Sequence, residues 1–360
     1  MNVLLFNLVT DCDDPVLGFT TLWIQELAKH CDTIDVITMR AGRIQAPENV
    51  RVFSVGKEHG YSEPRRAIEF YRILLRLLRT KKYDVCFAHM MPLFIVLGAP
   101  VLRLKHIQIV LWYTHKSVTV ILRLAHALTD RVVTASPESF RIPSNKVRII
   151  GHGIPTRLFV PSENDARGKR PFTFLTVGRL SRIKRIDLLL QALWLVKQRQ
   201  PDVSVQLQIV GGPVTEADLR YEAELQELVK QYELREDVHF LGSMTFRQVL
   251  PYYQQADCFV NLSETGSIDK AVLEAMSCGK AVLVNPVFTA LLGPDLAQRC
   301  VVNWEIEQLY ERLIGMMRLP ADERQALGAQ LRQLVVRDHD LRGLCKRLVQ
   351  EFQDVIAKKR

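Results

Sequence analysis

The sequence lacks several patterns that would place it in a particular class of protein. Its seven cysteines are widely spaced and form no C-x-x-C pair, so we expect buried thiols in a reducing compartment, not a disulfide framework or a zinc site. The longest apolar run, residues 86–102, is shorter than the roughly 20 residues of a membrane span, and His89 and two prolines interrupt it. No basic segment precedes the apolar residues 1–9, which predicts a strand and no signal peptide. These absences favour a cytoplasmic protein.

The composition is that of an ordinary globular protein, but its charge is uneven. The 360 residues are 48% hydrophobic and 24% charged, which suits two domains with substantial cores. Residues 1–160 hold 21 basic and 13 acidic side chains, whereas residues 161–360 hold 27 and 26, so the first part carries +8 of the net charge of +9. This excess indicates either an anionic partner for the first domain or a basic surface in solvent.

A basic helix is predicted over residues 64–82. One face carries four arginines, Arg65, Arg72, Arg76 and Arg79, and another carries Ile68, Tyr71, Leu75 and Leu78. Such a helix can lie on an anionic membrane at the inner face of the plasma membrane, or it can cover a sheet with its arginines in solvent. We expect no nucleic-acid binding, because the chain has no recognisable module for it and no aromatics interleaved with the basic residues.

Short apolar strands alternate with helical segments, and the series occurs twice. The predicted strands are 2–9, 34–39, 85–88, 108–112, 131–134 and 147–150, then 172–177, 205–210, 238–241, 258–262 and 281–284. The predicted helices are 20–29 and 64–82, then 185–197, 217–232, 246–254 and 270–278, with helical residues over 305–360. Such alternation is typical of an α/β fold with two parallel sheets. We expect an N-terminal domain at 1–160, a C-terminal domain at 161–340 joined through a polar linker at 155–171, and a last helix at 341–360 that returns to the first domain.

Three strand ends in the second domain carry glycine. The strand 172–177 runs into Gly178 and Arg179, and Lys184 follows before a helix. Two cations beside a helix start suit a diphosphate, although basic loops at helix starts are also common in solvent. Gly211 and Gly242 follow the next two strands, where glycine permits close ligand approach or forms a plain turn.

The most specific segment is residues 261–282. A strand ends there, a loop rich in Gly, Ser and Thr follows, and a helix begins near Asp269, with Ser267 or Asp269 as its N-cap. Glu274 then lies about one turn into the helix, where its carboxylate can accept hydrogen bonds from both hydroxyls of a ribose.

These segments resemble the family-four retaining glycosyltransferases of the GT-B fold. That family shows a strand followed by Gly-Arg-Leu and Lys, a Val-Gly-Gly strand end, a Phe-Leu-Gly segment and Leu-Glu-Ala-Met-x-Cys-Gly, and this chain has all four in order. The first domain agrees more loosely through residues 84–89, 111–116, 133–136 and 150–159. The resemblance implies two Rossmann-like domains that face each other across a cleft. It also implies a nucleoside-diphosphate-sugar donor and no metal or other cofactor.

The resemblance also implies roles for individual residues. Arg179 and Lys184 would stabilise the leaving diphosphate, Glu274 would hold the ribose, and His115 would approach the transferred sugar. The other residues that it places around the substrate are Gly18, Gly178, Gly211, Gly242, Ser243, Met244, Thr265, Gly266, Ser267, Asp269 and Lys270. We expect His89 and His152 to be structural.

Three positions depart from the family pattern. Gly266 stands where the family has a glutamate eight residues before Glu274, and Asp269 is a possible replacement. The N-terminal Gly-Gly pair is reduced to Gly18, and Pro155 replaces an expected aspartate.

Asp11-Cys12-Asp13 matches the metal-binding D-x-D of the other glycosyltransferase fold, but acidic loops arise easily by chance, so we expect no metal there.

The sequence favours transfer of a sugar to a lipid-linked or cell-envelope glycan, with the acceptor inferred from charge alone. Two alternatives stay open. One is a sugar-nucleotide epimerase on the same fold. The other is a non-catalytic partner subunit of a glycosyltransferase, suggested by Gly266.

Overall fold

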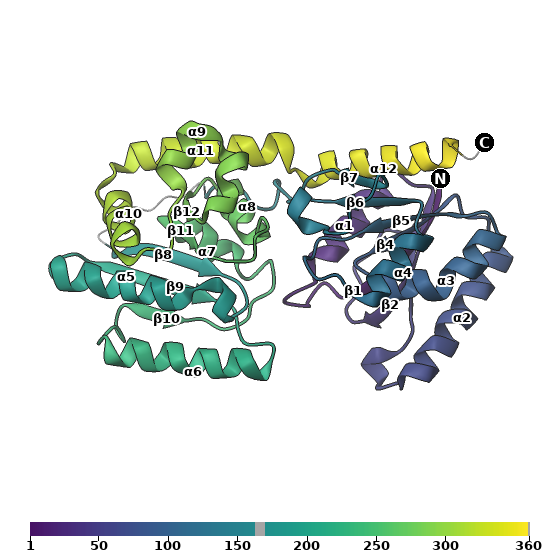
Figure 1. Ribbon diagram of the computed structural model, residues 1–360, viewed down its shortest axis with the longest axis horizontal. Coiled ribbons are helices and arrows are strands. Elements are labelled where there is room, and N and C mark those ends of the chain that lie inside the picture. Colours follow the sequence, from purple (N-terminus) through teal and green to yellow (C-terminus); the bar gives the residue numbers. More distant parts are fainter. Residues whose placement is uncertain (163–169, 359–360) are drawn as a thin grey trace. The chain divides into compact units, whose positions relative to one another are not determined.

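The computed structural model describes residues 1–162 and 170–358, which divide into two compact units (Figure 1). The first unit comprises Met1–Gly153 and Asp340–Arg360, and the second comprises Ile154–His339. The chain therefore passes between the units twice, first at Gly153 and Ile154 and again at His339 and Asp340. Part of the linker predicted at 155–171, residues 163–169, lies outside the described residues.

The first unit is a seven-stranded parallel sheet in the order β3-β2-β1-β4-β5-β6-β7. Its strands are β1 (Asn2–Thr10), β2 (Thr33–Ala41), β3 (Val50–Ser54), β4 (Val85–His89), β5 (Gln108–Trp112), β6 (Arg131–Thr134) and β7 (Val147–Ile149). Its helices are α1 (Phe19–Ala28), α2 (Glu63–Thr80), α3 (Pro92–Leu104), α4 (Val120–Leu128) and α12 (Leu341–Ala357), with short 3-10 turns η1 (Lys57–His59) and η2 (Pro137–Ser139).

Helices cover both faces of this sheet, as a parallel sheet with apolar strands requires. Apolar side chains of α2, α3 and α4 form one core with one face of the strands, and those of α1 and α12 form a second core with the other face. Central strands are therefore buried on both sides, and all five residues of β4 are buried. Helices α2, α3 and α4 thus form one layer, and the outer side of this layer faces solvent.

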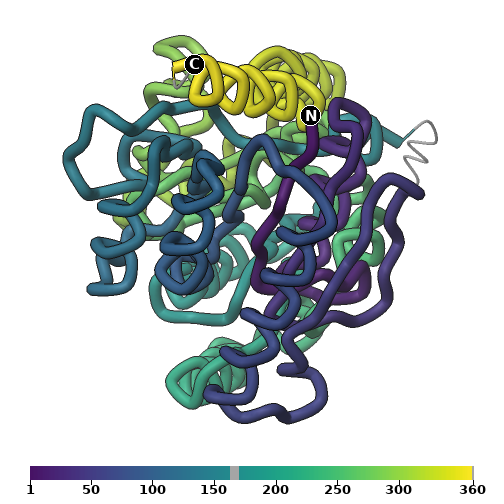
Figure 2. The backbone as a smooth tube through the Cα atoms, turned by 90° about the vertical axis from the view of Figure 1, so that its right-hand side faces the viewer, coloured from purple at the N-terminus to yellow at the C-terminus, as the bar shows by residue number. Residues whose placement is uncertain are grey.

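The C-terminal helix α12 belongs to the first unit and packs against α1 (Figure 2). The side chain of Asp340 caps it by accepting hydrogen bonds from the backbone N–H groups of Arg342 and Gly343. Phe352 is fully buried in the core shared with the strands, and the partly buried Glu351 forms an ion pair with Arg131 of β6. The last helix therefore completes the core of the unit that the first residues begin.

The second unit is a five-stranded parallel sheet in the order β10-β9-β8-β11-β12. Its strands are β8 (Phe172–Val177), β9 (Val205–Val210), β10 (Val238–Phe240), β11 (Cys258–Asn261) and β12 (Ala281–Val284). Its helices are α5 (Ile186–Arg199), α6 (Glu216–Gln231), α7 (Leu250–Gln255), α8 (Lys270–Ser277), α9 (Thr289–Cys300), α10 (Ile306–Arg318) and α11 (Ala321–Asp338), with 3-10 turns η3 (Arg182–Lys184) and η4 (Pro286–Phe288).

The strand order of the second sheet reverses between β8 and β11. From β8 the chain builds outward through β9 to β10, then returns to pair β11 with the other edge of β8. Loops that leave the carboxyl ends of β8 and β11 diverge at such a point, and ligands of open α/β sheets bind in the crevice between them. From the fold alone, we therefore expect a ligand to bind between the loops after Val177 and Asn261.

Several elements differ from those that the sequence predicts. Strand β3 and helices α3 and α4 were not predicted, because β3 is a half-polar edge strand and Pro100 interrupts the apolar pattern of α3. The helix predicted at 246–254 is wrong at its start, since α7 begins at Leu250. A turn precedes it, in which the Gln248 side chain accepts hydrogen bonds from the N–H and hydroxyl of Thr245.

All seven cysteines are buried free thiols, as the sequence predicts. Within residues 1–162 and 170–358, no helix is both long and apolar enough to cross a membrane.

Candidate nucleotide-sugar site

The two loops at the switch point of the second sheet meet through an ion pair. The Nζ atom of Lys184, at the end of η3, lies 2.7 Å from Oδ2 of Asp269, the N-cap residue of α8. The same carboxylate accepts a hydrogen bond of 3.0 Å from Nδ2 of Asn261, the last residue of β11. Lys184 and Asp269 are each 17% exposed, so this charge pair stands at the mouth of the crevice.

The second predicted cation, Arg179, lies in the same loop after β8. Its Nε atom is 3.8 Å from Oδ2 of Asp218, and its side chain is about half exposed. Asp218 is itself held in place, because it forms a capping box with Thr215 at the start of α6. Each predicted diphosphate ligand therefore has a carboxylate beside it in the unliganded protein.

The three glycines predicted at strand ends converge. The N–H of Gly178 donates to the carbonyl of Val210 at 2.9 Å, and the N–H of Gly211 donates to the carbonyl of Gly242 at 2.8 Å. Gly211 has a φ of +137°, and a Cβ atom there would lie 1.8 Å from the carbonyl oxygen of Gly178. Glycine is therefore required at Gly211 so that the ends of β8, β9 and β10 can approach one another.

Glu274 lies one turn inside α8 and is held by a buried tyrosine. The Tyr253 hydroxyl, on α7, donates a hydrogen bond of 2.9 Å to Oε2 of Glu274. Burial raises the pKa of Glu274 to about 7, and burial lowers the pKa of Lys270, one turn earlier on the same helix, to about 7. Both groups therefore change charge near neutral pH, which is common at functional sites.

The loop between β11 and α8 presents small polar residues. The hydroxyl of Thr265 donates to the carbonyl of Ser267, and Gly266 has a φ of +67°. Glu264 is turned away to form an ion pair with Arg185. Among the acidic residues of this loop, Asp269 and not Glu264 is therefore the carboxylate beside Lys184.

The remaining predicted site residues lie in both units. Ser243 and Met244 follow β10, directly after Gly242, and Ser243 is exposed. Gly18 is the N-cap residue of α1 in the first unit, where a Cβ atom would lie 2.6 Å from the carbonyl oxygen of Asp14. His115 is exposed in the loop after β5, and its Nδ1 atom accepts a hydrogen bond from the N–H of Ser117.

The other two histidines noted in the sequence are buried. His89 ends β4 with its ring stacked on Trp112, at a centroid distance of 6.4 Å and an interplanar angle of 3°. His152 is buried just before the first crossing between units.

Arginine side chains form ion pairs with acidic residues of the D-x-D loop after β1. Asp13 forms a two-pronged ion pair with Arg43, and Asp14 pairs with Arg40. Ligand atoms of Asp11, Cys12 and Asp13 lie within 4.8 Å of one another, but the Asp11 carboxylate already accepts the N–H groups of Asp13 and Arg43. This loop therefore uses its carboxylates to fix its own shape.

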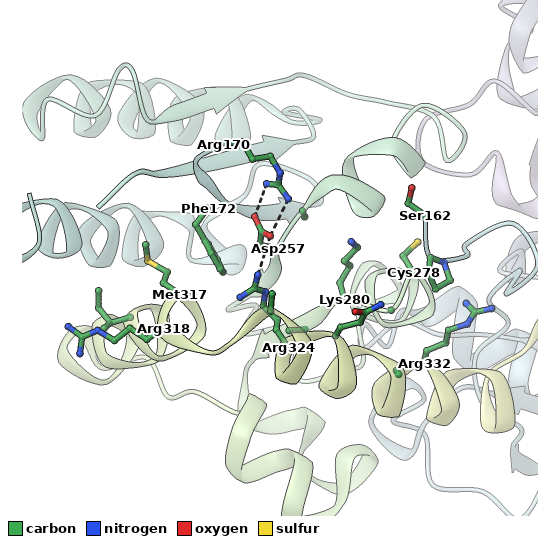
Figure 3. Close-up of a pocket in the computed structure, with 18 of the residues that line it drawn as sticks. Ser162, Arg170, Phe172, Asp257, Cys278, Lys280, Met317, Arg318, Arg324 and Arg332 are labelled. Carbon is green, nitrogen blue, oxygen red and sulfur yellow. Dashed lines mark hydrogen bonds and ion pairs between the residues drawn. The ribbon is translucent and has the colours of Figure 1, made fainter. Parts of the chain in front are cut away.

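A large cavity of about 1080 Å³ occurs at the opposite edge of the second sheet (Figure 3). It adjoins the amino ends of β8, β11 and β12, and a face of α11 lines it. Arg332 donates to the carbonyl of Ser277 at the end of α8, Lys280 to that of Gln254 near the end of α7, and Arg324 to that of Leu319 after α10. These three cations thus pair with carbonyls at helix carboxyl ends, and Arg170 and Arg324 also form ion pairs with Asp257.

Sequence reasoning missed the residues that hold the predicted ligands. These are Asp218 beside Arg179, Asn261 beside Asp269 and Tyr253 beside Glu274. Ser181, between the two cations, also has a buried hydroxyl with no partner among the described residues. The Thr215 to Asp218 spacing is a capping-box signal that the sequence offered, whereas the partners of Asn261 and Tyr253 are set by tertiary packing alone.

Two family signatures match this chain. The sequence signature described as Glycosyltransferase Family 4 matches residues 19–158, and that described as Glycosyl transferases group 1 matches residues 171–318. Together the two matches take in most of the chain.

Among curated proteins, D-inositol 3-phosphate glycosyltransferase of Pseudarthrobacter chlorophenolicus is 31% identical over 149 residues, 40% of this chain and 34% of that protein. The putative colanic acid biosynthesis glycosyltransferase WcaL of Salmonella typhimurium is 24% identical over 230 residues, 61% of this chain and 53% of that protein. The matches thus span between a third and about half of these relatives' lengths.

Solved structures share the fold over nearly the whole chain. Anabaena HepE in complex with UDP has a TM-score of 0.77 at 18% identity, covering 98% of this chain and 100% of its own. Sucrose-phosphate synthase of Thermosynechococcus elongatus has a TM-score of 0.75 at 17% identity, covering 98% and 99%. With the two sequence signatures and the convergent glycine loops, these likenesses identify the chain as a member of the family-four glycosyltransferases of the GT-B fold.

Proposed function

We propose that this chain transfers a sugar from a nucleoside-diphosphate sugar to a lipid-linked or cell-envelope glycan, with retention at the anomeric carbon. The observation that carries the proposal is the Lys184–Asp269 pair at the switch point, with Arg179 in the same loop. Anabaena HepE, which has the same fold, binds UDP and UDP-glucose, and a relative is named for colanic acid biosynthesis. The first observation supports a nucleotide-sugar donor, and the second supports a cell-envelope glycan as acceptor.

The protein promotes this reaction mainly by electrostatic stabilisation. As the bond between sugar and diphosphate breaks, negative charge gathers on the leaving phosphate, and Arg179 and Lys184 stabilise it. The leaving oxygen takes the proton of the acceptor hydroxyl, so no protein carboxylate is needed as base. Glu274 orients the nucleotide by accepting hydrogen bonds from the ribose, and its own orientation is fixed by Tyr253.

Contact with an anionic membrane through α2 belongs to the same proposal. The buried side of this helix consists of Phe70, Ile73, Leu74, Leu77 and Leu78. Ile68 and Leu75 are exposed, on the side that also carries Arg65, Arg72, Arg76 and Arg79. Leu78, which the sequence groups with them, is buried instead. Arginines with exposed aliphatic neighbours suit an anionic interface, where each basic residue contributes about 1 kcal/mol.

Two alternatives predict different products. An epimerase would convert the donor sugar without any acceptor. A non-catalytic partner subunit would bind nucleotide weakly or not at all. The presence of Arg179 and Lys184 in the loop after β8, and of Glu274 on α8, favours an enzyme over the partner subunit.

A thermal-shift screen tests the donor site. The unfolding temperature is measured with UDP, GDP, ADP and TDP sugars, because stabilisation grows with ligand concentration over dissociation constant. We expect one nucleotide to stabilise the protein, and Arg179→Ala and Glu274→Ala each to abolish the shift. Arg182→Ala is the matched control, since this exposed arginine of the same loop pairs with Glu224 instead. An unchanged shift in both site variants would contradict the assignment, and a shift followed by sugar conversion without acceptor would indicate the epimerase.

A further inference from the structure

The helical layer α2–α4 of the first unit exposes an unusual amount of apolar surface. Of the 15 large apolar side chains that the described residues expose, seven belong to these three helices. Three of the seven lie on the short helix α4: Val120 is 74% exposed, Ile121 44% and Leu124 50%. An aliphatic cluster in solvent marks a binding surface more often than a chance arrangement.

Packing of α4 explains why these three side chains share one side. Leu122 and Ala125 are buried against the core, where α4 packs on α3. Thr119 caps the helix, because its hydroxyl accepts a hydrogen bond from the N–H of Leu122. Val120 and Ile121 lie four and three residues before Leu124, the spacings that make neighbours on a helix surface, so the three exposed side chains share one side. We call Val120, Ile121 and Leu124 the α4 patch (Figure 1 labels α4).

The sequence on either side of the α4 patch is poor in acidic residues. No aspartate or glutamate occurs in the 45 residues from Val85 to Thr129, although the chain has 39 among 360 residues. Lys116, four residues before the patch, and Arg123, within it, are the nearest cations in sequence. An apolar cluster with positive side chains beside it in the sequence suits an amphiphile whose polar end is an anion.

Its place in the fold connects the α4 patch with the proposed reaction. The loop that contains His115 leaves the carboxyl end of β5 and leads directly into α4 at Val120. The patch therefore begins at the edge of the first sheet where ligands of α/β folds bind. Leu104, which is 80% exposed, ends α3 just before the amino end of β5 and so lies at the opposite edge.

We infer that the α4 patch binds the hydrocarbon chain of a lipid-linked glycan acceptor, while Lys116 and Arg123 meet the phosphate that joins its lipid to its glycan. This inference rests on the proposed function and narrows its acceptor to a lipid-linked one. The hydrocarbon chain gains by leaving water against Val120, Ile121 and Leu124. The two cations distinguish a phosphorylated lipid from a neutral one.

Binding of an isoprenyl monophosphate, held below its micelle concentration, tests the inference on the full chain. The matching isoprenyl alcohol and inorganic phosphate are measured alongside it by a titration that reports Kd. We expect the isoprenyl phosphate to bind at least tenfold more tightly than either. The triple variant Val120→Ser, Ile121→Ser, Leu124→Ser, and separately Lys116→Ala with Arg123→Ala, should each raise its Kd at least tenfold. The control Leu104→Ser should leave its Kd unchanged.

Two results would overturn the inference. One is an isoprenyl phosphate Kd that the triple variant leaves unchanged. The other is a triple variant that loses co-sedimentation with phosphatidylglycerol vesicles but keeps its affinity for the dispersed lipid, which would make the patch a bilayer contact. The nucleotide-sugar thermal shift of the same variants separates the two proposals. If the shift is absent in the unaltered protein, the proposed function fails, whereas a normal shift with unaltered lipid binding counts against the α4 patch alone.

Discussion

Lys184 and Asp269 form a pair, 2.7 Å from Nζ to Oδ2, that joins the loops after β8 and β11. This chain thus places a carboxylate beside the lysine that we propose as a ligand of the diphosphate. Asn261 holds the same oxygen, so Asp269 keeps Lys184 in a fixed position before the donor arrives. In the proposed function, the carboxylate therefore competes with the diphosphate for that lysine.

Replacing Asp269 should separate these two effects. We expect Asp269→Asn to tighten the binding of nucleoside diphosphate about five- to tenfold, roughly 1 kcal/mol, because a competing negative charge is removed. The rate of sugar transfer should fall, because Lys184 is no longer held. Isothermal titration and steady-state kinetics measure the two quantities. Glu264→Gln is the control, since Glu264 pairs with Arg185. Weaker nucleotide binding by Asp269→Asn would show that the carboxylate does not compete.

Nucleotide affinity should have a maximum near neutral pH. Burial raises the pKa of Glu274 to about 7, so the carboxylate that we propose to bind the ribose is lost as the pH falls below 7. Burial lowers the pKa of Lys270 to about 7, so its positive charge is lost as the pH rises above 7. We expect Kd, measured from about pH 5.5 to 8.5, to be lowest near pH 7. Glu274→Gln should remove the acidic limb and Lys270→Arg the alkaline limb. A Kd that does not vary with pH would contradict both roles.

A methyl group at Gly211 should damage the donor site and the fold together. The Cβ atom of Gly211→Ala would lie 1.8 Å from the carbonyl oxygen of Gly178, so the ends of β8 and β9 must separate. We expect a loss of about 3 kcal/mol in the free energy of unfolding and no measurable nucleotide binding. Gly60→Ala is the control, because Gly60 also has a positive φ but no neighbouring atom within 4 Å. Its cost should be about 1–2 kcal/mol from backbone conformation. If Gly211→Ala and Gly60→Ala lowered the free energy of unfolding equally, the close approach of Gly211 to the carbonyl of Gly178 would not matter for stability.

Arg332 should matter for stability and not for donor binding. Its guanidinium donates to the carbonyls of Phe159 and Ser277. Arg332→Ala removes this donor from both part-buried acceptors, although the Phe159 carbonyl keeps the Ser277 hydroxyl as a partner. We expect the free energy of unfolding in urea to fall by about 2 kcal/mol while the nucleotide Kd stays the same. Arg337→Ala, which removes an exposed arginine paired with its neighbour Asp338, should cost less than about 0.5 kcal/mol. If Arg332→Ala abolished nucleotide binding instead, the cavity beside α11 would need another interpretation.

Much of the fold was predictable where a strand is apolar and ends at a glycine or a polar residue. The bounds of β8, β9 and β12 agree with prediction to the residue. Prediction failed for α3, because Pro100 lies inside a helix that tertiary packing tolerates.

For the site, sequence reasoning found residues that follow strand ends but not the residues that hold them. The loops that carry Gly178, Gly211 and Lys184 follow from strand ends and residue type. Asp218 and Tyr253 lie on helices whose contacts depend on how the chain packs, which no local pattern encodes.

Because Ile154–His339 is inserted between two parts of the first unit, the order of synthesis differs from the order in space. On the ribosome, the whole second unit emerges before α12 does. The first 153 residues therefore expose to water the apolar side chains that later pack against Phe352 and Leu348, until α12 has also left the exit tunnel.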